Sequence, residues 1–295
     1  MPTVGIISPG AMGSAVADAL ARGGARVVGT AASRSARTIE LAERARIELL
    51  PGLDAVVRES SVLLSIVPPE VAESVAAEIA GLARTLSDRR LLVDLNAIAP
   101  DTSRRIAAVM GSSGHDYVDG SISGPPPWRP DTTRIYLSGQ RASEVADLPF
   151  VGVARIVVGG EVGMASAVKM STASVYKGTS ALLAHALLAA DENGVLEHVL
   201  TDLRAGSPEL VANIERRLAS AAAKSGRFVA EMREIAATQE AAGLTPALFD
   251  AMADVFAAFS ESDLARSAPE EIAQDVRLDA VLHGLRRARN DRVDG

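Results

Sequence analysis

The chain has 295 residues, 48% hydrophobic and 23% charged, which is enough for two globular domains with ordinary cores. Its net charge of −7, without a basic stripe, argues against nucleic acid or anionic membranes as partners. Cysteine is absent, which excludes disulfides, thiolate metal sites and a cysteine nucleophile, and suits a cytoplasmic location.

Short apolar runs alternate with amphipathic helical patterns through the first half of the chain. Continuous apolar strands separated by such helices indicate a parallel sheet covered on both faces, a doubly wound Rossmann arrangement. The expected strands are 3–7, 25–29, 62–67, 91–95, 117–118, 134–137 and 154–158, and the expected helices are 11–21, 35–45, 70–86 and 102–110.

The pattern changes near Gly159-Gly160, after which the sequence predicts only helices. The first of these is long and rich in alanine, leucine and small polar residues, and no apolar run is long enough to span a bilayer. We therefore expect an α/β Rossmann domain at 1–160 and an all-helical domain at 161–295, joined by the long helix. The four histidines lack metal-ligand spacing, so no metal is expected.

The segment Ser8-Pro9-Gly10-Ala11-Met12-Gly13 lies between the first strand and the first helix, where a dinucleotide fold needs its glycine turn. Gly10 would let the backbone approach a diphosphate, and Gly13 would let the helix pack close to the strand. Ser8 replaces the first glycine of the usual fingerprint. The helix N-terminus would hold the phosphates, and the alternative is an ordinary turn without a ligand.

The end of the second strand predicts which cofactor binds. An NAD-specific site normally has an acidic residue here that accepts hydrogen bonds from the ribose 2′-hydroxyl. No acidic residue occurs between residues 25 and 38. Ser33, Arg34 and Arg37 could instead hold a 2′-phosphate, which favours NADP. The alternative is a solvated loop and helix face.

Three segments resemble the β-hydroxyacid dehydrogenase superfamily, which includes 3-hydroxyisobutyrate and 6-phosphogluconate dehydrogenases. Residues 4–13 resemble its opening segment, 119–124 (Asp-Gly-Ser-Ile-Ser-Gly) its substrate-binding loop, and 163–169 the start of its interdomain helix. The second half resembles a phosphogluconate-dehydrogenase-like branch, on the basis of Lys169-Met170 and Lys177-Gly178. The resemblance implies dimers formed through the helical domain.

Lys169 occupies the position of the superfamily's catalytic lysine. Reducing a carbonyl by hydride creates an alkoxide that needs a proton, and a partly desolvated ammonium whose pKa is lowered towards neutrality can supply it. The lysine stands in a helix of otherwise apolar and small residues, where a charge without a role is costly. The alternative is a lysine that reaches solvent along the helix.

Several positions depart from the superfamily pattern. Thr172 and Ala173 replace an asparagine pair. The residues that could contact the substrate instead lie on this turn and the next turns of the same helix, and they are Ser171, Thr172, Ser174, Tyr176 and Lys177. Lys177 could equally be solvated. Three prolines follow Gly124 and donate no N–H, which alters the usual carboxylate site.

The remaining predicted contacts lie in that loop and at strand ends. Ser123 keeps a hydroxyl and Gly124 an amide for the substrate, and Trp128 could either wall the pocket or anchor the proline-rich loop. Val67-Pro68 resembles the superfamily's cofactor-contacting loop, and Asn96 is expected on the nicotinamide side. The alternative for Val67-Pro68 is a plain proline turn, and the alternative for Asn96 is a loop residue that caps backbone groups. Asp94 could serve structurally by hydrogen-bonding to the loop backbone.

The sequence thus predicts an NADP-dependent dehydrogenase or reductase acting on a small polar hydroxy or oxo compound. Imine reductases resemble the same architecture but usually have aspartate or tyrosine at the position of Lys169. A protein that binds NADP(H) without catalysis is the third alternative.

Overall fold

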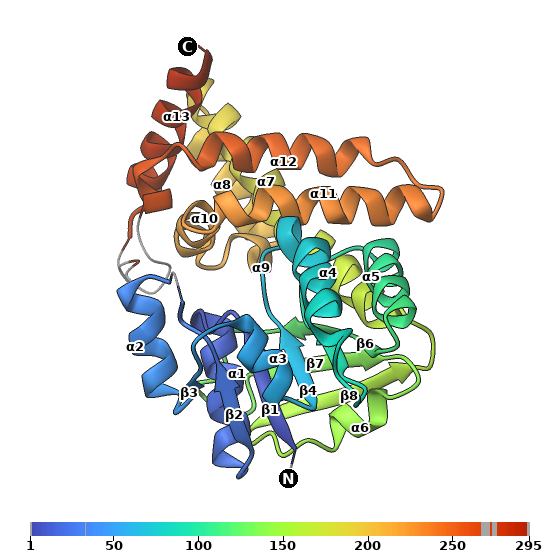
Figure 1. The fold of residues 1–295 in the computed structure, drawn as a ribbon. Coiled ribbons are helices and arrows are strands. Elements are labelled where there is room, and N and C mark those ends of the chain that lie inside the picture. Colours follow the sequence, from blue (N-terminus) through green and yellow to red (C-terminus); the bar gives the residue numbers. More distant parts are fainter. Residues whose placement is uncertain (1, 33, 267–271, 273–275, 294–295) are drawn as a thin grey trace. The chain divides into compact units, whose positions relative to one another are not determined.

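A computed structural model of the chain describes residues 2–32, 34–266, 272 and 276–293. The chain divides into two compact units, Met1–Met170 and Ser171–Gly295 (Figure 1). This division differs from the expected boundary at 160, because it falls inside the long helix α7 (Met164–Glu192). The start of α7 belongs to the first unit because it hydrogen-bonds to a strand there, as when the Ser121 hydroxyl donates to the Ala165 carbonyl oxygen at 2.8 Å.

The first unit is built on an eight-stranded sheet in the order β3-β2-β1-β4-β5-β6-β7-β8. From β3 to β6 all neighbours are parallel. Strands β4 and β5 are buried along their whole length, as expected for apolar strands covered on both faces. The strands are β1 (Thr3–Ile7), β2 (Arg26–Gly29), β3 (Glu48–Leu49), β4 (Val62–Ser65), β5 (Leu91–Asp94), β6 (Asp116–Ser123), β7 (Thr133–Ser138) and β8 (Val153–Gly159).

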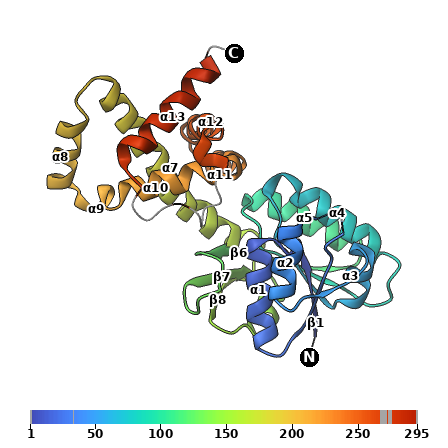
Figure 2. The same ribbon diagram turned by 90° about the vertical axis from the view of Figure 1, so that its left-hand side faces the viewer.

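Helices cover both faces of this sheet, and each face has its own hydrophobic cluster (Figure 2). Successive strand residues enter opposite clusters, so Leu64 packs with α1 and α2 whereas Leu63 packs with α3, α4 and α5. The helices of this unit are α1 (Ala11–Arg22), α2 (Ala36–Arg44), α3 (Leu53–Glu59), η1 (Pro69–Val71), α4 (Ala72–Ala83), α5 (Pro100–Ser112) and α6 (Ala142–Ala146).

The predicted doubly wound Rossmann sheet is confirmed, and one pair of neighbouring strands departs from its parallel arrangement. β7 runs antiparallel to β6, and β8 is then parallel to β7. Residues 124–132 join β6 to β7 without a helix, and so short a connection cannot make the crossover that parallel strands require. The short elements β3, α3 and α6 were not predicted.

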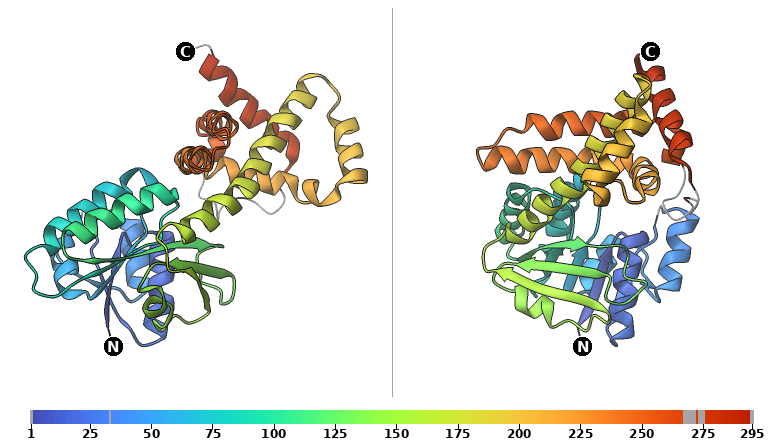
Figure 3. Two further views of the ribbon diagram at one scale, coloured as in Figure 1. Left: turned by 90° about the vertical axis from the view of Figure 1, so that its right-hand side faces the viewer. Right: turned by 180° about the vertical axis from the view of Figure 1, so that it is seen from behind.

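All the regular secondary structure among the described residues of the second unit is helical, as predicted. α11 and α12 lie side by side as an antiparallel pair (Figure 3). Phe256 of α12 packs edge-to-face on Phe228 of α11, with ring centroids 5.2 Å apart, and on Phe259 of its own helix at 6.1 Å. No helix in the described part of the chain combines the length and apolarity needed to cross a membrane. Beyond α7, the helices are α8 (Leu196–Gly206), α9 (Pro208–Val211), α10 (Ile214–Ala222), α11 (Ser225–Ala241), α12 (Ala247–Phe259), η2 (Asp263–Arg266) and α13 (Leu278–Val293).

Candidate active site

The turn between β1 and α1 has the close packing that a dinucleotide site needs. A Cβ atom added to Gly13 would overlap the carbonyl oxygen of Ser8, so only glycine fits where the helix starts against the strand. Gly10 is the N-cap residue of α1, and a Cβ there would meet no atom within 4 Å. Because the first amides of a helix lack intrahelical acceptors, this end of α1 can receive a phosphate.

Ser8 adopts the backbone conformation that the missing fingerprint glycine would adopt. Its φ is +75°, in the left-handed region, which costs a non-glycine residue on the order of 1 kcal/mol. The hydroxyl of Ser14 donates to the carbonyl oxygen of Pro9 at 2.7 Å and ties the turn to the first turn of α1. The serine therefore stands at the glycine position of the motif in a conformation that glycine adopts without strain.

The candidate 2′-phosphate residues follow β2. Arg34 lies in the loop and Arg37 in the first turn of α2, and both are exposed, whereas Ser33 lies outside the described residues. Ser35 caps α2 by accepting a hydrogen bond from the amide of Thr38 at 3.3 Å. The loop is thus anchored at the helix start, and phosphate binding by the arginines stays a prediction.

Asn96 joins the ends of β4 and β5. Its side chain is buried, accepts a hydrogen bond from the Val67 amide at 2.6 Å and donates to Ser65 at 3.2 Å. It also donates to Asp94 at 2.9 Å, while the Asn96 amide donates to the other oxygen of Asp94 at 2.8 Å. The structural role predicted for Asp94 is confirmed, and Asn96 orients the loop that begins at Val67-Pro68.

Burial raises the pKa of Asp94 from 3.8 to about 7. The hydrogen bonds from Asn96 oppose this shift, and the charge of Asp119, its register partner on β6, adds to it. A carboxyl group that titrates near neutrality thus lies directly beneath the predicted cofactor loop.

Lys169 is held at the C-terminal end of β6. Its ammonium is half-buried and donates to the carbonyl oxygen of Ile122 at 2.8 Å. Ser123, the last residue of β6, comes directly after Ile122. Gly124 comes next with a φ of +118°, and a Cβ atom there would overlap the carbonyl oxygen of Thr132. The structure therefore brings Lys169 to the strand end that carries the predicted substrate-binding residues Ser123 and Gly124.

The other predicted substrate contacts on α7 belong to the second unit. Tyr176 is 73% exposed, and Thr172 is half-buried. Lys177 is neither solvated nor open to solvent anions, because it forms a buried ion pair with Glu231 and lies 4.6 Å from the ring centre of Phe228. Anion binding by Lys177 would have to compete with that carboxylate, and the substrate roles of these three residues stay predictions.

Trp128 is packed rather than projecting. Its ring is half-buried against the cluster that includes α1 and α2, and the guanidinium of Arg44 stacks 4.3 Å from the ring centre. This geometry agrees with an anchor for the proline-rich loop, and a role in the substrate pocket remains untested.

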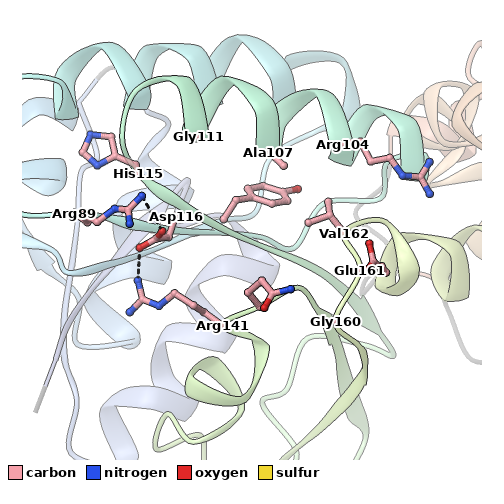
Figure 4. A pocket seen from close by; sticks show the side chains of 12 residues that line it. Arg89, Arg104, Ala107, Gly111, His115, Asp116, Arg141, Gly160, Glu161 and Val162 are labelled. Carbon is pink, nitrogen blue, oxygen red and sulfur yellow. Dashed lines mark hydrogen bonds and ion pairs between the residues drawn. The ribbon is translucent and has the colours of Figure 1, made fainter.

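A polar pocket of about 480 Å³ opens at the opposite end of β6 (Figure 4). Asp116 lies between Arg89 and Arg141, and pairs with them at 3.4 and 2.7 Å. Ile122 lies six positions after Asp116 along β6, which is roughly 20 Å of extended strand. This pocket is therefore separate from the Lys169 site, and two of its arginines already form ion pairs with its own acid, Asp116.

Asp119, the first residue of the substrate-loop motif, was not among the site residues predicted from the sequence. Its carboxylate is fully buried and hydrogen-bonds to the beginning of α7. An acid within the apolar part of a strand was the available signal, since such a buried charge needs several donors.

Comparisons with known proteins agree with this arrangement. Residues 3–149 match the NAD binding domain of 6-phosphogluconate dehydrogenase, and residues 190–259 match a domain of unknown function, DUF1932. A solved conserved protein of unknown function, described as structurally similar to 3-hydroxyacid dehydrogenases, is 30% identical over 90% of this chain and 98% of its own, with a TM-score of 0.66.

Two further solved structures share the fold at lower identity. The Mycobacterium tuberculosis 3-hydroxyisobutyrate dehydrogenase, solved with L-serine, is 21% identical over 97% of this chain and 99% of its own, with a TM-score of 0.70. An imine reductase from Myxococcus stipitatus, solved with NADP+, is 20% identical over 87% and 93%, with a TM-score of 0.55. At these identities the likeness shows the fold alone.

Proposed function

Because the chain belongs to the β-hydroxyacid dehydrogenase superfamily, we propose that it transfers a hydride between NADP(H) and a small polar hydroxy or oxo compound. The observation that carries the proposal is the placement of Lys169, whose ammonium is held 2.8 Å from the Ile122 carbonyl oxygen, next to Ser123. The phosphate-binding turn lies in the same compact unit.

The turn at Ser8–Gly13 fits a dinucleotide for two reasons. Gly13 lets α1 start close against the Ser8 carbonyl, where a Cβ atom would overlap, and Gly10 leaves open space at the start of α1. When bound, NADP(H) supplies or accepts the hydride. The turn would hold the diphosphate, and the loop at Val67-Pro68, oriented by Asn96, would border the cofactor. Arg34 and Arg37, with Ser33, would bind the 2′-phosphate and so select NADP over NAD.

Lys169 would move the proton that accompanies the hydride. In reduction it gives a proton to the substrate oxygen, and in oxidation it takes the proton from the hydroxyl. An ammonium has three N–H donors, and the bond to Ile122 fixes the direction of the side chain. The Ser123 hydroxyl and the Gly124 amide would bind the polar group of the substrate.

The proposal is tested first by cofactor binding and then by turnover. A ligand that binds only the folded chain raises its melting temperature, so NADPH should raise it more than NADH does at equal concentration. Lys169→Met should bind NADPH normally yet lose most turnover with a panel of small hydroxy and oxo acids. Lys224→Met is the matched control, because Lys224 bonds to Ser220 in the helical unit. Normal turnover by Lys169→Met would reject the lysine as the proton-transfer group.

The same panel separates the competing functions. Faster reduction of cyclic imines than of ketones would indicate an imine reductase, whereas NADPH binding without any hydride transfer would indicate a binding protein. Homodimers formed through the helical unit and a cytoplasmic location are part of the proposal, and size-exclusion chromatography with light scattering tests the former.

A further inference from the structure

Five hydrogen-bond donors converge on the buried carboxylate of Asp119 in β6. Three reach one oxygen and two reach the other, and three of the five come from residues at the start of α7. They are the amides of Gly163 and Ser166 at 3.0 Å each and the hydroxyl of Ser138 at 2.9 Å on Oδ2, and the hydroxyls of Ser103 at 2.9 Å and Ser166 at 2.6 Å on Oδ1.

Asp119 caps the N-terminus of α7 from outside the helix. Its side chain, on strand β6, accepts hydrogen bonds from the backbone amides of Gly163 and Ser166. The first amides of a helix need acceptors, and its N-terminus favours a negative charge. Gly163 takes a φ of +101°, and a Cβ there would lie 3.2 Å from both Arg104 and Pro100. The helix therefore starts in a conformation that few other residues could adopt, with its amides directed at one carboxylate.

The directions of the hydrogen bonds made by the hydroxyls of Ser103, on α5, and Tyr117 are also fixed. The single hydroxyl proton of Ser103 is donated to Asp119, so the Tyr117 hydroxyl must be the donor in its 2.8 Å contact with Ser103. Burial and the charges of Asp94 and Asp119 hold the pKa of Tyr117 well above its usual value, which keeps that proton in place. The chain of bonds from Tyr117 to Asp119 thus runs in one direction.

Three successive contacts fasten α7 along β6. Asp119 holds the first turn, the Ser121 hydroxyl donates to the Ala165 carbonyl oxygen, and Ile122 accepts from Lys169. Ser166 and Lys169 are three residues apart, so they lie on the same face of the helix. The strand that carries Ser123 therefore also sets the position of the lysine.

We propose that Asp119 is a positioning residue for Lys169. By fastening the first turn of α7 to β6, it keeps the ammonium at the Ile122 carbonyl, beside the predicted substrate-binding residues. The catalytic meaning of this placement rests on the proposed function, but the placement itself is measurable without a substrate.

The composition of the chain makes that measurement simple, because Lys169, Lys177 and Lys224 are its only lysines. Labelling of the folded full-length chain with limiting acetic anhydride, followed by peptide mass spectrometry, gives the relative reactivity of each. Asp119→Ala should raise the labelling rate of Lys169 about fivefold relative to Lys224, the factor that corresponds to the loss of one ordinary hydrogen bond. Ser166→Ala should raise it less, in the same direction.

Asp119→Asn separates positioning from charge. Its amide oxygen can still accept from the two α7 amides, while Ser103 and Ser166 can turn their hydroxyls to accept from its NH₂ group. We therefore expect Asn to restore labelling to within about twofold of the natural chain. Asp94→Ala, which removes an equally buried carboxylate that does not bond to α7, should leave Lys169 unchanged.

These variants distinguish failure of the inference from failure of the proposed function. Unchanged Lys169 labelling in Asp119→Ala, or an equal rise in Asp94→Ala, would overturn the positioning role. Should Asp119→Ala fail to fold, Ser166→Ala decides by the same criterion. The absence of hydride transfer would overturn the proposed function and leave the labelling result intact.

Discussion

The buried carboxyl of Asp94 makes stability depend on pH in an unusual direction. In the unfolded chain its pKa is 3.8, and burial in the folded chain raises it to about 7. Because the folded state binds this proton more tightly, the stabilising contribution is full below about pH 4 and is lost as the pH rises through about 7. Most paired acids behave in the opposite way, since they destabilise a fold when they become protonated.

The size of the effect follows from the two pKa values. Each tenfold difference in proton affinity is worth about 1.4 kcal/mol, so the full loss is about 4 kcal/mol. Between pH 5 and pH 8, the range in which the chain can conveniently be studied, the contribution of Asp94 to the free energy of unfolding should fall by about 2.5 kcal/mol.

Urea unfolding followed by tryptophan fluorescence reports on the first unit, which contains Asp94. Trp128 is the only tryptophan of the chain and is packed in that unit. Asp94→Asn is similar in size and does not titrate in this range, so the difference between the two chains isolates the carboxyl. The natural chain should lose about 2.5 kcal/mol more than the variant over the same pH range. Parallel pH profiles for the two chains would refute the reasoning.

Three further predictions concern the cofactor turn, the cofactor phosphate and the helical unit. Gly13→Ala forces a Cβ onto the Ser8 carbonyl and should weaken NADPH binding by about tenfold or more in calorimetry. The control Gly81→Ala, where a Cβ meets nothing within 4 Å, should bind normally, and equal affinities would contradict the assigned turn. Arg34→Ala should weaken NADPH about tenfold and leave NADH unaffected, whereas equal losses would remove the case for a 2′-phosphate site. Lys177→Met leaves the buried carboxylate of Glu231 with Arg227, at 3.0 Å, as its remaining partner, and should destabilise the helical unit by about 2 kcal/mol in circular dichroism melts, with partial recovery on adding Glu231→Gln.

The sequence was sufficient for the elements whose patterns are local. Strands such as 62–67 are uninterrupted apolar runs, and the glycine turn follows the first strand directly, so both could be placed by spacing. The direction of β7 was missed because residue alternation is the same in parallel and antiparallel strands. Only the lack of a crossover helix between Ser123 and Thr133 reveals it.

The candidate site was predictable where it follows the superfamily and obscure where it depends on distant contacts. Lys169 was identified from its helix. Its hydrogen bond to Ile122, 47 residues earlier, could not be read from spacing. For Lys177 the sequence left open either an anionic substrate group or solvent as its partner, and its ion pair with Glu231 depends on a different helix. Asp119 was not predicted as a site residue because its donors come from three separate segments, α5, β7 and the start of α7, that meet only in the folded chain.

The passage of α7 from one unit into the other also dictates where the protein can be cut for separate study. A recombinant fragment that stops at residue 160 would keep every strand of the sheet, yet it would strip Asp119 of both α7 amides and one of its hydroxyl donors. A fragment extended past Met170 would keep them all, together with the lysine. The shorter piece should therefore express as an aggregation-prone protein and the longer one as a stable nucleotide-binding module.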